Sequence, residues 1–387
     1  MPPVVGGPNF CGRDVTTVFV PQGTAAAYRA AEYWKTKNIV DGAVGVSITV
    51  ELSQAGTLGE KILAQVQYLN LVNKLKVKGP MNASDFTQIK NVMTGLFSID
   101  LSEATFTAIP NEVFRGKYGL YEAVLPEGLQ TIGDYAFSQT MVKKMVLPST
   151  VTTLGHRCFY DCDGLFKVTF PRDLKTMGSE AFRTCDCLDS VRILPGLTAI
   201  PDHCFRECTS LKELSLPNTL QTIAYCGFYN STGLESIVLP ESVTYIGESA
   251  FSECHSLKNV VLPANLQTLW NYGFYNTQIA SVTLPASLTS MGYNVFTGAL
   301  KKITCMQPAP PILTDDPFVN VTKGSCELVV PSWSVNSYKL ANIWCNFYPV
   351  STYDAAAIKY LTVRGELILP DSARPTNKPI VSVLQNG

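Results

Sequence analysis

The chain has 387 residues, of which 46% are hydrophobic and 16% are charged, and its formal net charge at pH 7 is −1. It contains no run rich in Lys and Arg, which argues against nucleic acid as its principal partner. It has no signal peptide at its start and no transmembrane segment, because no apolar stretch reaches the ~20 residues that span a bilayer.

The first 42 residues share a pattern with residues 306–351. Each segment has a Val-Pro step with a Tyr 7 residues later and a Trp 13 residues later. Thr24 and Ser334 stand at matching positions, where an N-cap residue begins a short helix. We therefore expect residues 306–351 to be a C-terminal capping unit and residues 1–42 to be a partial second copy of it. The matching residues are Pro21, Tyr28 and Trp34 at the front and Pro331, Tyr338 and Trp344 near the end.

A capping unit closes the open apolar end of a repeat array. A partial cap at residues 1–42 therefore predicts that the chain is a piece, or a shortened version, of a longer tandem array. On this interpretation the partial unit belongs to an upstream array, and any native signal sequence lies upstream of Met1.

Residues 43–110 lack the period of the later chain, and we interpret them as an N-terminal α/β cap that merges into the first repeat. Leu58–Leu71 has apolar residues near helical spacing, and Ser84 or Asp85 is expected to cap a second helix that runs to about Met93. The expected strands and turn are Ser47–Leu52, Leu75–Val77, a turn at Gly79-Pro80, and Leu96–Leu101.

Between residues 111 and 305 a phenylalanine recurs every 22 or 23 residues, in phase with a Leu-Pro or Phe-Pro step. Self-similarity at this period is typical of a solenoid, in which each unit buries its apolar face by stacking on its neighbours. We expect about nine repeats here, with α/β capping segments at the ends. The repeating residues are Phe114, Phe137, Phe159, Phe182, Phe205, Phe228, Phe251, Phe274 and Phe296.

One repeat shows how each unit is expected to fold. Leu211–Leu216 has the spacing of a strand with one leucine-lined face, and Pro217 ends it because proline has no N–H to donate. Asn218–Ile223 is expected to be a second short extended segment, followed by a compact turn around Phe228.

Three residues after each phenylalanine lies a small residue, and we call this position the small column. Cysteine alternates there with threonine, serine and alanine, a mixture that no metal site or disulfide framework would tolerate. We therefore interpret the cysteines as reduced core residues that fill a narrow slot. The small column contains Thr140, Cys162, Cys185, Cys208, Ser231, Cys254, Thr277 and Ala299.

The pattern Leu-x-x-Ile-x-Leu-Pro-x-x-Val-x-x-Ile-Gly-x-x-Ala-Phe-x-x-Cys is nearly complete in Leu234–Cys254. It resembles the BspA-like leucine-rich repeat family over about residues 96–305, with modest departures where Pro201 and Ala224 replace the Gly. The resemblance implies a leucine-rich repeat solenoid, β-dominated although α/β by class. It also implies a secreted or outer-surface bacterial protein of the Bacteroides type that adheres to host or bacterial macromolecules.

The strands of such a solenoid form an exposed sheet, and two outward columns of this sheet are the candidate binding strip. It is mildly apolar and rich in hydroxyl groups, has basic ends and would be about 35–40 Å long. Such a face suits a protein or glycan partner, although Val and Thr are also ordinary strand-surface residues. The first column contains Val146, Thr169, Arg192, Ser215, Val238, Val261, Thr283 and Thr304. The second contains Lys144, Lys167, Ser190, Glu213, Ser236, Asn259, Ser281 and Lys302.

The sequence gives no sign of an enzyme. His156, His203 and His255 fall at three different positions relative to the repeat phenylalanine, so they do not stack into one metal or acid–base site. No phosphate-binding loop, zinc-protease pair or nucleophile elbow occurs. We therefore expect no catalytic residue, cofactor or metal.

Two functions stay open. The first is a monomeric surface module for adhesion or recognition, and the second is a structural spacer that displays other parts of a longer protein. A concentrated aromatic patch would favour glycan binding, but Tyr and Trp look scattered along the chain. Residues 352–387 are expected to form a β-rich tail or to begin a further module, with strands at Leu361–Val363, Glu366–Pro370 and Val381–Val383.

Overall fold

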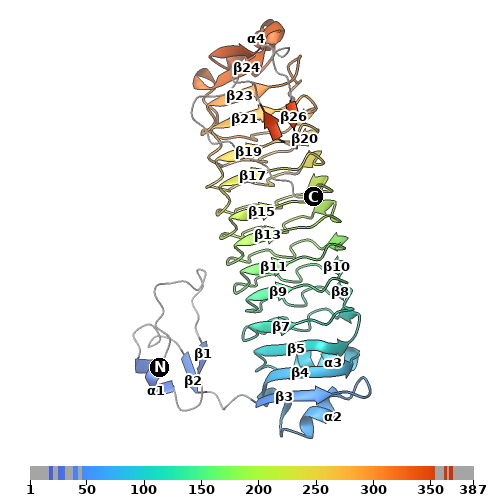
Figure 1. Ribbon diagram of the computed structural model, residues 1–387. Coiled ribbons are helices and arrows are strands. Elements are labelled where there is room, and N and C mark those ends of the chain that lie inside the picture. The colour runs from blue at the N-terminus through green and yellow to red at the C-terminus, as the bar shows by residue number, and fades with distance from the viewer. Residues whose placement is uncertain are drawn as a thin grey trace.

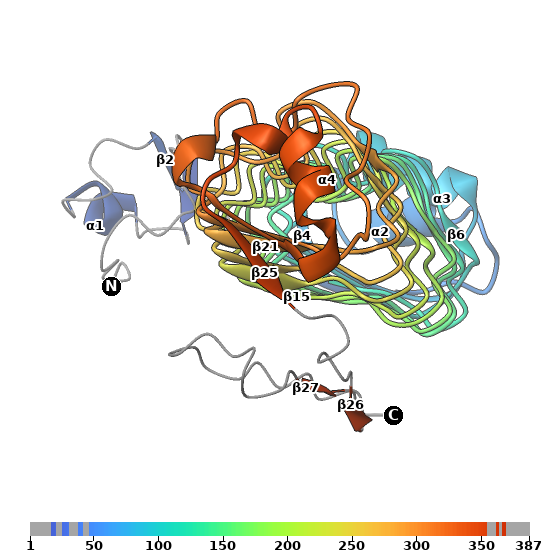
Figure 2. The same ribbon diagram turned by 90° about the horizontal axis from the view of Figure 1, so that it is seen from above.

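The computed structural model describes residues 17–20, 25–30, 38–41, 46–353, 361–363 and 366–368. Residues 46–353 form a solenoid of stacked coils, and Figure 1 shows the strands of successive coils arranged in two columns. Seen along the solenoid axis in Figure 2, the coils lie one above another. The predicted β-dominated leucine-rich repeat solenoid is confirmed.

One column of strands is the first sheet, which carries one strand per coil, usually of three residues, and is parallel throughout. The predicted strand from Leu211 to Leu216 is shorter than expected, because Leu211 donates its backbone N–H to Cys208 and belongs to the preceding turn. The strands of the first sheet in the repeats are β7 (Glu122–Val124), β9 (Lys144–Val146), β11 (Lys167–Thr169), β13 (Ser190–Arg192), β15 (Glu213–Ser215), β17 (Ser236–Val238), β19 (Asn259–Val261), β21 (Ser281–Leu284) and β23 (Lys302–Cys305).

The other column is the second sheet, which carries two residues per coil and is also parallel. Its second residue is buried in every coil and its first faces outward. The predicted extended segment Asn218–Ile223 is a strand only at its last two residues. The strands of the second sheet are β6 (Ala108–Ile109), β8 (Thr131–Ile132), β10 (Thr153–Leu154), β12 (Thr176–Met177), β14 (Ala199–Ile200), β16 (Thr222–Ile223), β18 (Tyr245–Ile246), β20 (Thr268–Leu269) and β22 (Ser290–Met291).

The repeat phenylalanines stack face to face along the axis of the solenoid. Neighbouring rings from Phe137 to Phe274 are 5.2–5.4 Å apart between centroids and within 8° of parallel. The stack continues one ring further than the period predicted, from Phe296 to Phe318 at 6.1 Å. All ten rings are buried, so this ladder is the centre of the hydrophobic core.

The small column provides hydrogen bonds as well as close packing. The thiols of Cys162, Cys185 and Cys208 each donate to the carbonyl of the phenylalanine in the preceding coil at 3.0–3.1 Å, and the Ser231 hydroxyl does the same at 2.9 Å. These cysteines are free and buried, as predicted. The interpretation does not extend to Cys187, which lies outside the column and is disulfide-bonded.

The turn around each phenylalanine joins the coils a third time. In one turn the N–H groups of Tyr135, Phe137 and Gln139 donate to carbonyls of the next coil at 2.9, 2.8 and 2.8 Å. Tyr135 and Gln139 have φ angles of 54° and 60°, in the left-handed region that costs a non-glycine residue about 1–3 kcal/mol. The same two positions are left-handed in every coil from Phe137 to Phe274. The sequence did not predict this conformation, which the bonds between coils stabilise.

The segment before the repeats extends the first sheet. Strands β3 (Val46–Glu51), β4 (Val72–Pro80) and β5 (Ser98–Thr105) are parallel and lead to β7. The predicted turn at Gly79-Pro80 is wrong, because both residues end β4. Glycine is needed at position 79, where φ is 87° and a Cβ would lie 2.1 Å from the Leu52 carbonyl oxygen.

The two helices of this segment also differ from the prediction. The expected helix from Leu58 to Leu71 is interrupted: α2 spans Leu58–Leu63, and Leu69–Leu71 is a 3₁₀ turn. Helix α3 (Ala83–Asn91) is capped by Asn82, not by Ser84 or Asp85. Asp85 instead completes a capping box by accepting the Asn82 N–H at 2.9 Å.

At the other end, Tyr338 and Trp344 close the phenylalanine ladder. The Trp344 ring meets the Phe318 ring edge-on, with 5.5 Å between the ring centroids. Figure 2 shows helix α4 over the end of the coils. Ser334 stands at the N-cap position of α4 as predicted, but its hydroxyl does not cap the helix and donates to the Pro308 carbonyl at 2.5 Å. The elements of this end are β24 (Glu327–Pro331), α4 (Val335–Leu340), β25 (Val350–Tyr353) and 3₁₀ turns at Lys323–Ser325, Ser332–Ser334 and Trp344–Asn346.

The front of the chain contains β1 (Thr17–Val20), α1 (Ala25–Ala30) and β2 (Asn38–Asp41), and its two strands pair in parallel. Strands β24 and β25 flank α4 in the same order and also pair in parallel. Thr24, Trp34 and the Tyr28 side chain lie outside the described residues, as does Val381–Val383 of the tail. Strands β26 (Leu361–Val363) and β27 (Glu366–Ile368) form an antiparallel pair. The unit boundaries stay predictions.

Candidate functional site

The predicted strip lies on the outward face of the first sheet, and the structure brings its two columns together in register. Val146 pairs with Thr169, and Val238 pairs with Val261. Val146, Val238 and Val261 are 54%, 41% and 53% exposed. Exposed as well are Lys144, Lys167, Thr169, Arg192, Glu213, Ser215, Ser236, Asn259 and Thr283, whereas Ser190, Ser281, Lys302 and Thr304 are half-buried.

Three further exposed apolar residues adjoin this strip, two of them beyond its N-terminal end and one beside it. Tyr121, Val124 and Phe166 are 46%, 41% and 47% exposed and lie in or beside β7 and β11. The Lys143 ammonium lies 5.8 Å from the centre of the Tyr121 ring. Val124 could have been found by following the first column one coil further back, whereas Tyr121 and Phe166 stand one residue before the second column.

A second surface runs along the turns that follow the second sheet in the first half of the solenoid. Arginine side chains lie over tyrosine rings there, and we call this set the arginine ladder. The distances that follow run from the arginine Cζ atom to the centre of the tyrosine ring. The ladder contains Arg115 over Tyr135 at 4.8 Å, Arg157 over Tyr135 and Tyr160 at 5.6 and 5.4 Å, Arg183 over Tyr160 at 5.9 Å, and Arg206 over Tyr229 at 4.7 Å.

Carboxylates pair with all four of these arginines, and Glu112 binds Arg115 at 2.5 Å. Glu180 binds Arg157 at 2.7 Å and Arg183 at 2.8 Å, and Glu207 binds Arg206 at 3.1 Å. Burial raises the pKa of Glu180, but the hydrogen bonds from the two arginines outweigh burial and leave its pKa below the usual value. The charges of the ladder are therefore neutralised within the chain.

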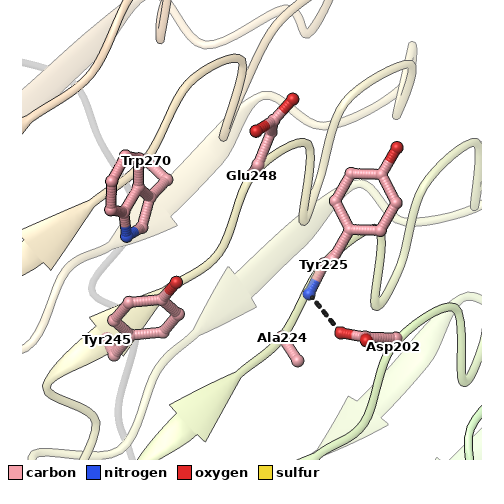
Figure 3. Close-up of a pocket in the computed structure, with 6 residues that line it drawn as sticks. All are labelled: Asp202, Ala224, Tyr225, Tyr245, Glu248 and Trp270. Atoms are coloured by element: carbon pink, nitrogen blue, oxygen red, sulfur yellow. Dashed lines mark hydrogen bonds between the residues drawn. The ribbon is translucent and has the colours of Figure 1, made fainter.

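Further along the same face, six residues line a shallow groove of about 330 Å³, shown in Figure 3. We call it the aromatic groove. Trp270 and Tyr245 lie on one side and Tyr225 and Asp202 on the other, with Glu248 between them. The lining residues are Asp202, Ala224, Tyr225, Tyr245, Glu248 and Trp270.

The groove is built at positions where the repeat departs from its usual residues. Tyr245 is the first residue of β18, a position that holds Thr in most other coils. Trp270 follows β20, where five coils have Gly, and Tyr225 stands where most other coils have a polar residue, although one has Tyr293. Trp270 and Tyr225 are 42% and 45% exposed, so neither is needed to fill the core. Stacking of four successive coils brings these residues together.

The groove is acidic. One oxygen of Asp202 accepts the Tyr225 N–H at 3.0 Å (Figure 3), and no cationic side chain lines the groove. The His203 ring meets the Tyr225 ring edge-on, with 4.8 Å between the ring centroids. The neighbouring Cys226 is the largest of several causes that raise the pKa of Tyr225, and Glu248 is another.

The expectation that Tyr and Trp are scattered is wrong for this part of the chain. It failed because residues 20–25 positions apart in sequence become neighbours when coils stack. The signal that would have found the groove was an aromatic residue in a Thr, Gly or Asx column, namely Tyr245, Trp270 and Tyr225.

The three histidines lie apart and have separate partners. His156 bonds Ser179 at 2.8 Å, His203 meets Tyr225, and His255 bonds the Asn276 carbonyl at 3.1 Å. Within the described ranges, no group of three or more His, Cys, Asp or Glu residues is arranged to hold a metal ion. A helix with the length and apolar character to cross a bilayer is also not found in the parts of the chain described.

Comparison with known proteins adds a family and a set of folds. The BspA type leucine rich repeat region matches residues 93–198 and 175–304. A leucine-rich repeat protein from Bacteroides ovatus is 21% identical, with 79% of this chain and 88% of that chain covered at a TM-score of 0.42. A leucine rich cell surface protein from Faecalibacterium prausnitzii is 22% identical, with 59% and 84% covered at a TM-score of 0.32. The search of curated proteins found no match.

Proposed function

Because the chain belongs to the BspA-type leucine-rich repeat family, we propose that it is a non-enzymatic, secreted or surface-exposed bacterial protein of the Bacteroides type. Its role on this proposal is adhesion to, or recognition of, a protein or glycan on a host or bacterial surface. It acts as a monomer and needs no cofactor.

The observation that carries the proposal is the exposed apolar row on the first sheet. Val146, Val238 and Val261 are each more than two-fifths exposed, and Tyr121 and Phe166 adjoin the row at one end. Val238 and Val261 are direct neighbours in this row, and adjoining apolar side chains in solvent are typical of interaction surfaces. The lysines at the ends of the strip would add charge complementarity, which favours specificity over raw affinity.

The test is binding of the purified chain to an array of host matrix proteins and bacterial glycans. We expect a saturable partner whose binding is lost when Val238→Lys and Val261→Lys are combined. The matched control is Gln130→Lys with Thr198→Lys, which adds the same charge at two exposed residues beside the second sheet. Binding that survives in the strip variant would contradict a role for the strip.

The alternative is a structural spacer that displays other parts of a longer protein. The observation in its favour is the strand, helix and parallel strand at β1–α1–β2, which have the order of the closing unit at β24–α4–β25. An array on which the unmodified chain shows no saturable binding would support the spacer and count against recognition.

A further inference from the structure

The turn face of the solenoid changes its composition halfway along. In the coils up to Phe228, four arginines lie over tyrosine rings, and three glutamates pair with them. Beyond Arg206 the sequence has no arginine until Arg364. The aromatic groove therefore presents the same partners, tyrosine and tryptophan rings with carboxylates, without the cations that accompany them in the first half.

We propose that the aromatic groove binds arginine side chains of a partner polypeptide. Aromatic rings attract a guanidinium through their negative faces, and tryptophan does so most strongly. Carboxylates add charge-assisted hydrogen bonds to the planar donors of the guanidinium. The arginine ladder already combines tyrosine rings, carboxylates and arginines in this chain, with 4.7–5.9 Å between the arginine Cζ atoms and the ring centres.

The charge of the groove selects the ligand class. Asp202 and Glu248 are the two carboxylates that line the groove, and none of its lining residues is Lys, Arg or His. Within the described residues, no hydrogen bond or ion pair occupies the Glu248 carboxylate. An anionic ligand such as a phosphate or an acidic glycan is disfavoured by this charge. A neutral glycan could stack on the rings and donate hydroxyl hydrogen bonds to the carboxylates, but it lacks the positive charge that would neutralise them.

The dimensions favour an extended segment over a single small cation. The lining residues come from four successive coils, so the groove runs about 14 Å along the axis at ~4.8 Å per coil. A strand rises about 3.3 Å per residue, and an extended peptide would therefore place about four residues along the groove. Alternating arginines on such a peptide would lie on one side of it.

Arg206 marks the boundary between the two halves. It lies over Tyr229 and pairs with Glu207, and it acts electrostatically on Tyr225 at the edge of the groove. The groove therefore adjoins the last arginine of the ladder and lies beside it in the stack. The inference is independent of the first-sheet strip, because the groove adjoins the second sheet.

The probe is a labelled peptide of alternating Arg and Gly, compared with the same peptide in which citrulline replaces arginine. Citrulline keeps the shape of the side chain and removes the charge. Binding is measured by calorimetry and by the fluorescence of Trp270. We expect the arginine peptide to bind at least about tenfold more tightly than the citrulline peptide, and added salt to weaken its binding.

The variants restore the residues that other coils have at the same positions, so the fold is expected to tolerate them. They are Trp270→Gly, Tyr245→Thr and Glu248→Asn, and the last imitates Asn271, which accepts a backbone N–H of the next coil at 2.8 Å. We expect each to weaken the arginine peptide several-fold and the three together about tenfold or more. The matched control is Trp333→Ala, an exposed tryptophan at the C-terminal end.

Three results would overturn the proposal: equal binding of the citrulline peptide, unchanged binding by the triple variant, or variant-sensitive binding of a neutral oligosaccharide such as maltohexaose in place of the peptide. The experiment also separates the two surfaces. The variant with Val238→Lys and Val261→Lys is expected to keep peptide binding, so a failure of the strip proposal would leave this result unchanged.

Discussion

The phenylalanine ladder and the aromatic groove are built by the same coils, but the ladder repeats one residue from coil to coil and the groove departs from the repeat at each of its aromatic positions. Phe205, Phe228, Phe251 and Phe274 are buried and stack 5.2–5.4 Å apart. Tyr225 and Trp270, from two of those coils, are more than two-fifths exposed.

This difference distinguishes residues that the stacking of coils requires from residues that it only tolerates. A coil loses core packing if its phenylalanine is removed, since its only apolar neighbours are the adjacent coils. A coil loses little if Tyr245 becomes Thr, because most other coils already have Thr there. Uniform columns thus indicate stability, and departures from them indicate a surface available for binding.

The largest expected effect is at the centre of the ladder. Phe205→Ala should destabilise the chain by about 3–5 kcal/mol, because it leaves a cavity between Phe182 and Phe228. Urea unfolding followed by circular dichroism measures the change. The control is Val261→Ala, a truncation of an exposed side chain that should cost about 0.5 kcal/mol or less. A loss below about 1 kcal/mol for Phe205→Ala would contradict the role of the ladder.

The next effect concerns the first coil, where Lys117 occupies the position that is small in later coils. Its ammonium donates to the Met93 carbonyl at 2.9 Å and to the Lys90 carbonyl, near the end of α3. Burial lowers the pKa of Lys117 to about 8. The unfolded chain therefore binds more protons than the folded chain between pH 8 and about 10.4, and stability should rise with pH in that window.

We expect this rise to be roughly 2 kcal/mol, which allows for solvent screening of the ammonium. The measurement is urea unfolding at several pH values from 7 to 10. Other groups also titrate in this range, so the quantity of interest is the difference from Lys117→Met. If both proteins show the same pH dependence, Lys117 does not cause it.

A smaller effect is expected in the small column. Cys208→Ala removes the thiol that donates to the Phe182 carbonyl at 3.1 Å, and should cost about 1 kcal/mol. Cys208→Ser should cost less, because Ser231 makes the same bond at 2.9 Å in the next coil. The measurement is the urea midpoint of unfolding of each variant, compared with that of the unmodified chain. Equal losses would show that the size of the residue matters and its donor does not.

The smallest effect on stability is expected in the groove. Trp270→Gly, Tyr245→Thr and Glu248→Asn should each change the free energy of unfolding by about 0.5 kcal/mol or less. Thermal unfolding measures this before any binding experiment. A loss as large as that of Phe205→Ala would mean that the groove residues support the stack, and the contrast between the two regions would fail.

The sequence predicted the first-sheet strip better than the groove, for a geometric reason. Val238 and Val261 stand 23 residues apart in the same column, and the period alone places them side by side. Tyr225, Tyr245 and Trp270 stand in three different columns, so their convergence depends on the path of the turn and on the rise of the coils. Most of the arginine ladder could have been found in the same way as the strip, because Arg115, Arg183 and Arg206 each stand directly after a repeat phenylalanine.

The ends of the solenoid show the same limit. The Tyr and Trp spacing predicted the closing unit, but the bond of Ser334 to Pro308 joins residues 26 positions apart and replaces the local cap. Asp85 likewise accepts the Leu58 N–H at 2.9 Å in addition to its role in the capping box. Local sequence rules describe a residue and its near neighbours, whereas these contacts form only after the segments have packed.

By itself the sequence determined the solenoid, its period, the buried phenylalanine and small columns, and the two outward columns of the first sheet. Each follows from one repeated length, because stacking identical coils places equivalent residues in line. Only the tertiary structure decided the left-handed turns, the contacts of the ladder arginines with their tyrosine rings, and the aromatic groove. These depend on which different columns adjoin across successive coils, and that relation is fixed by the three-dimensional path of the backbone.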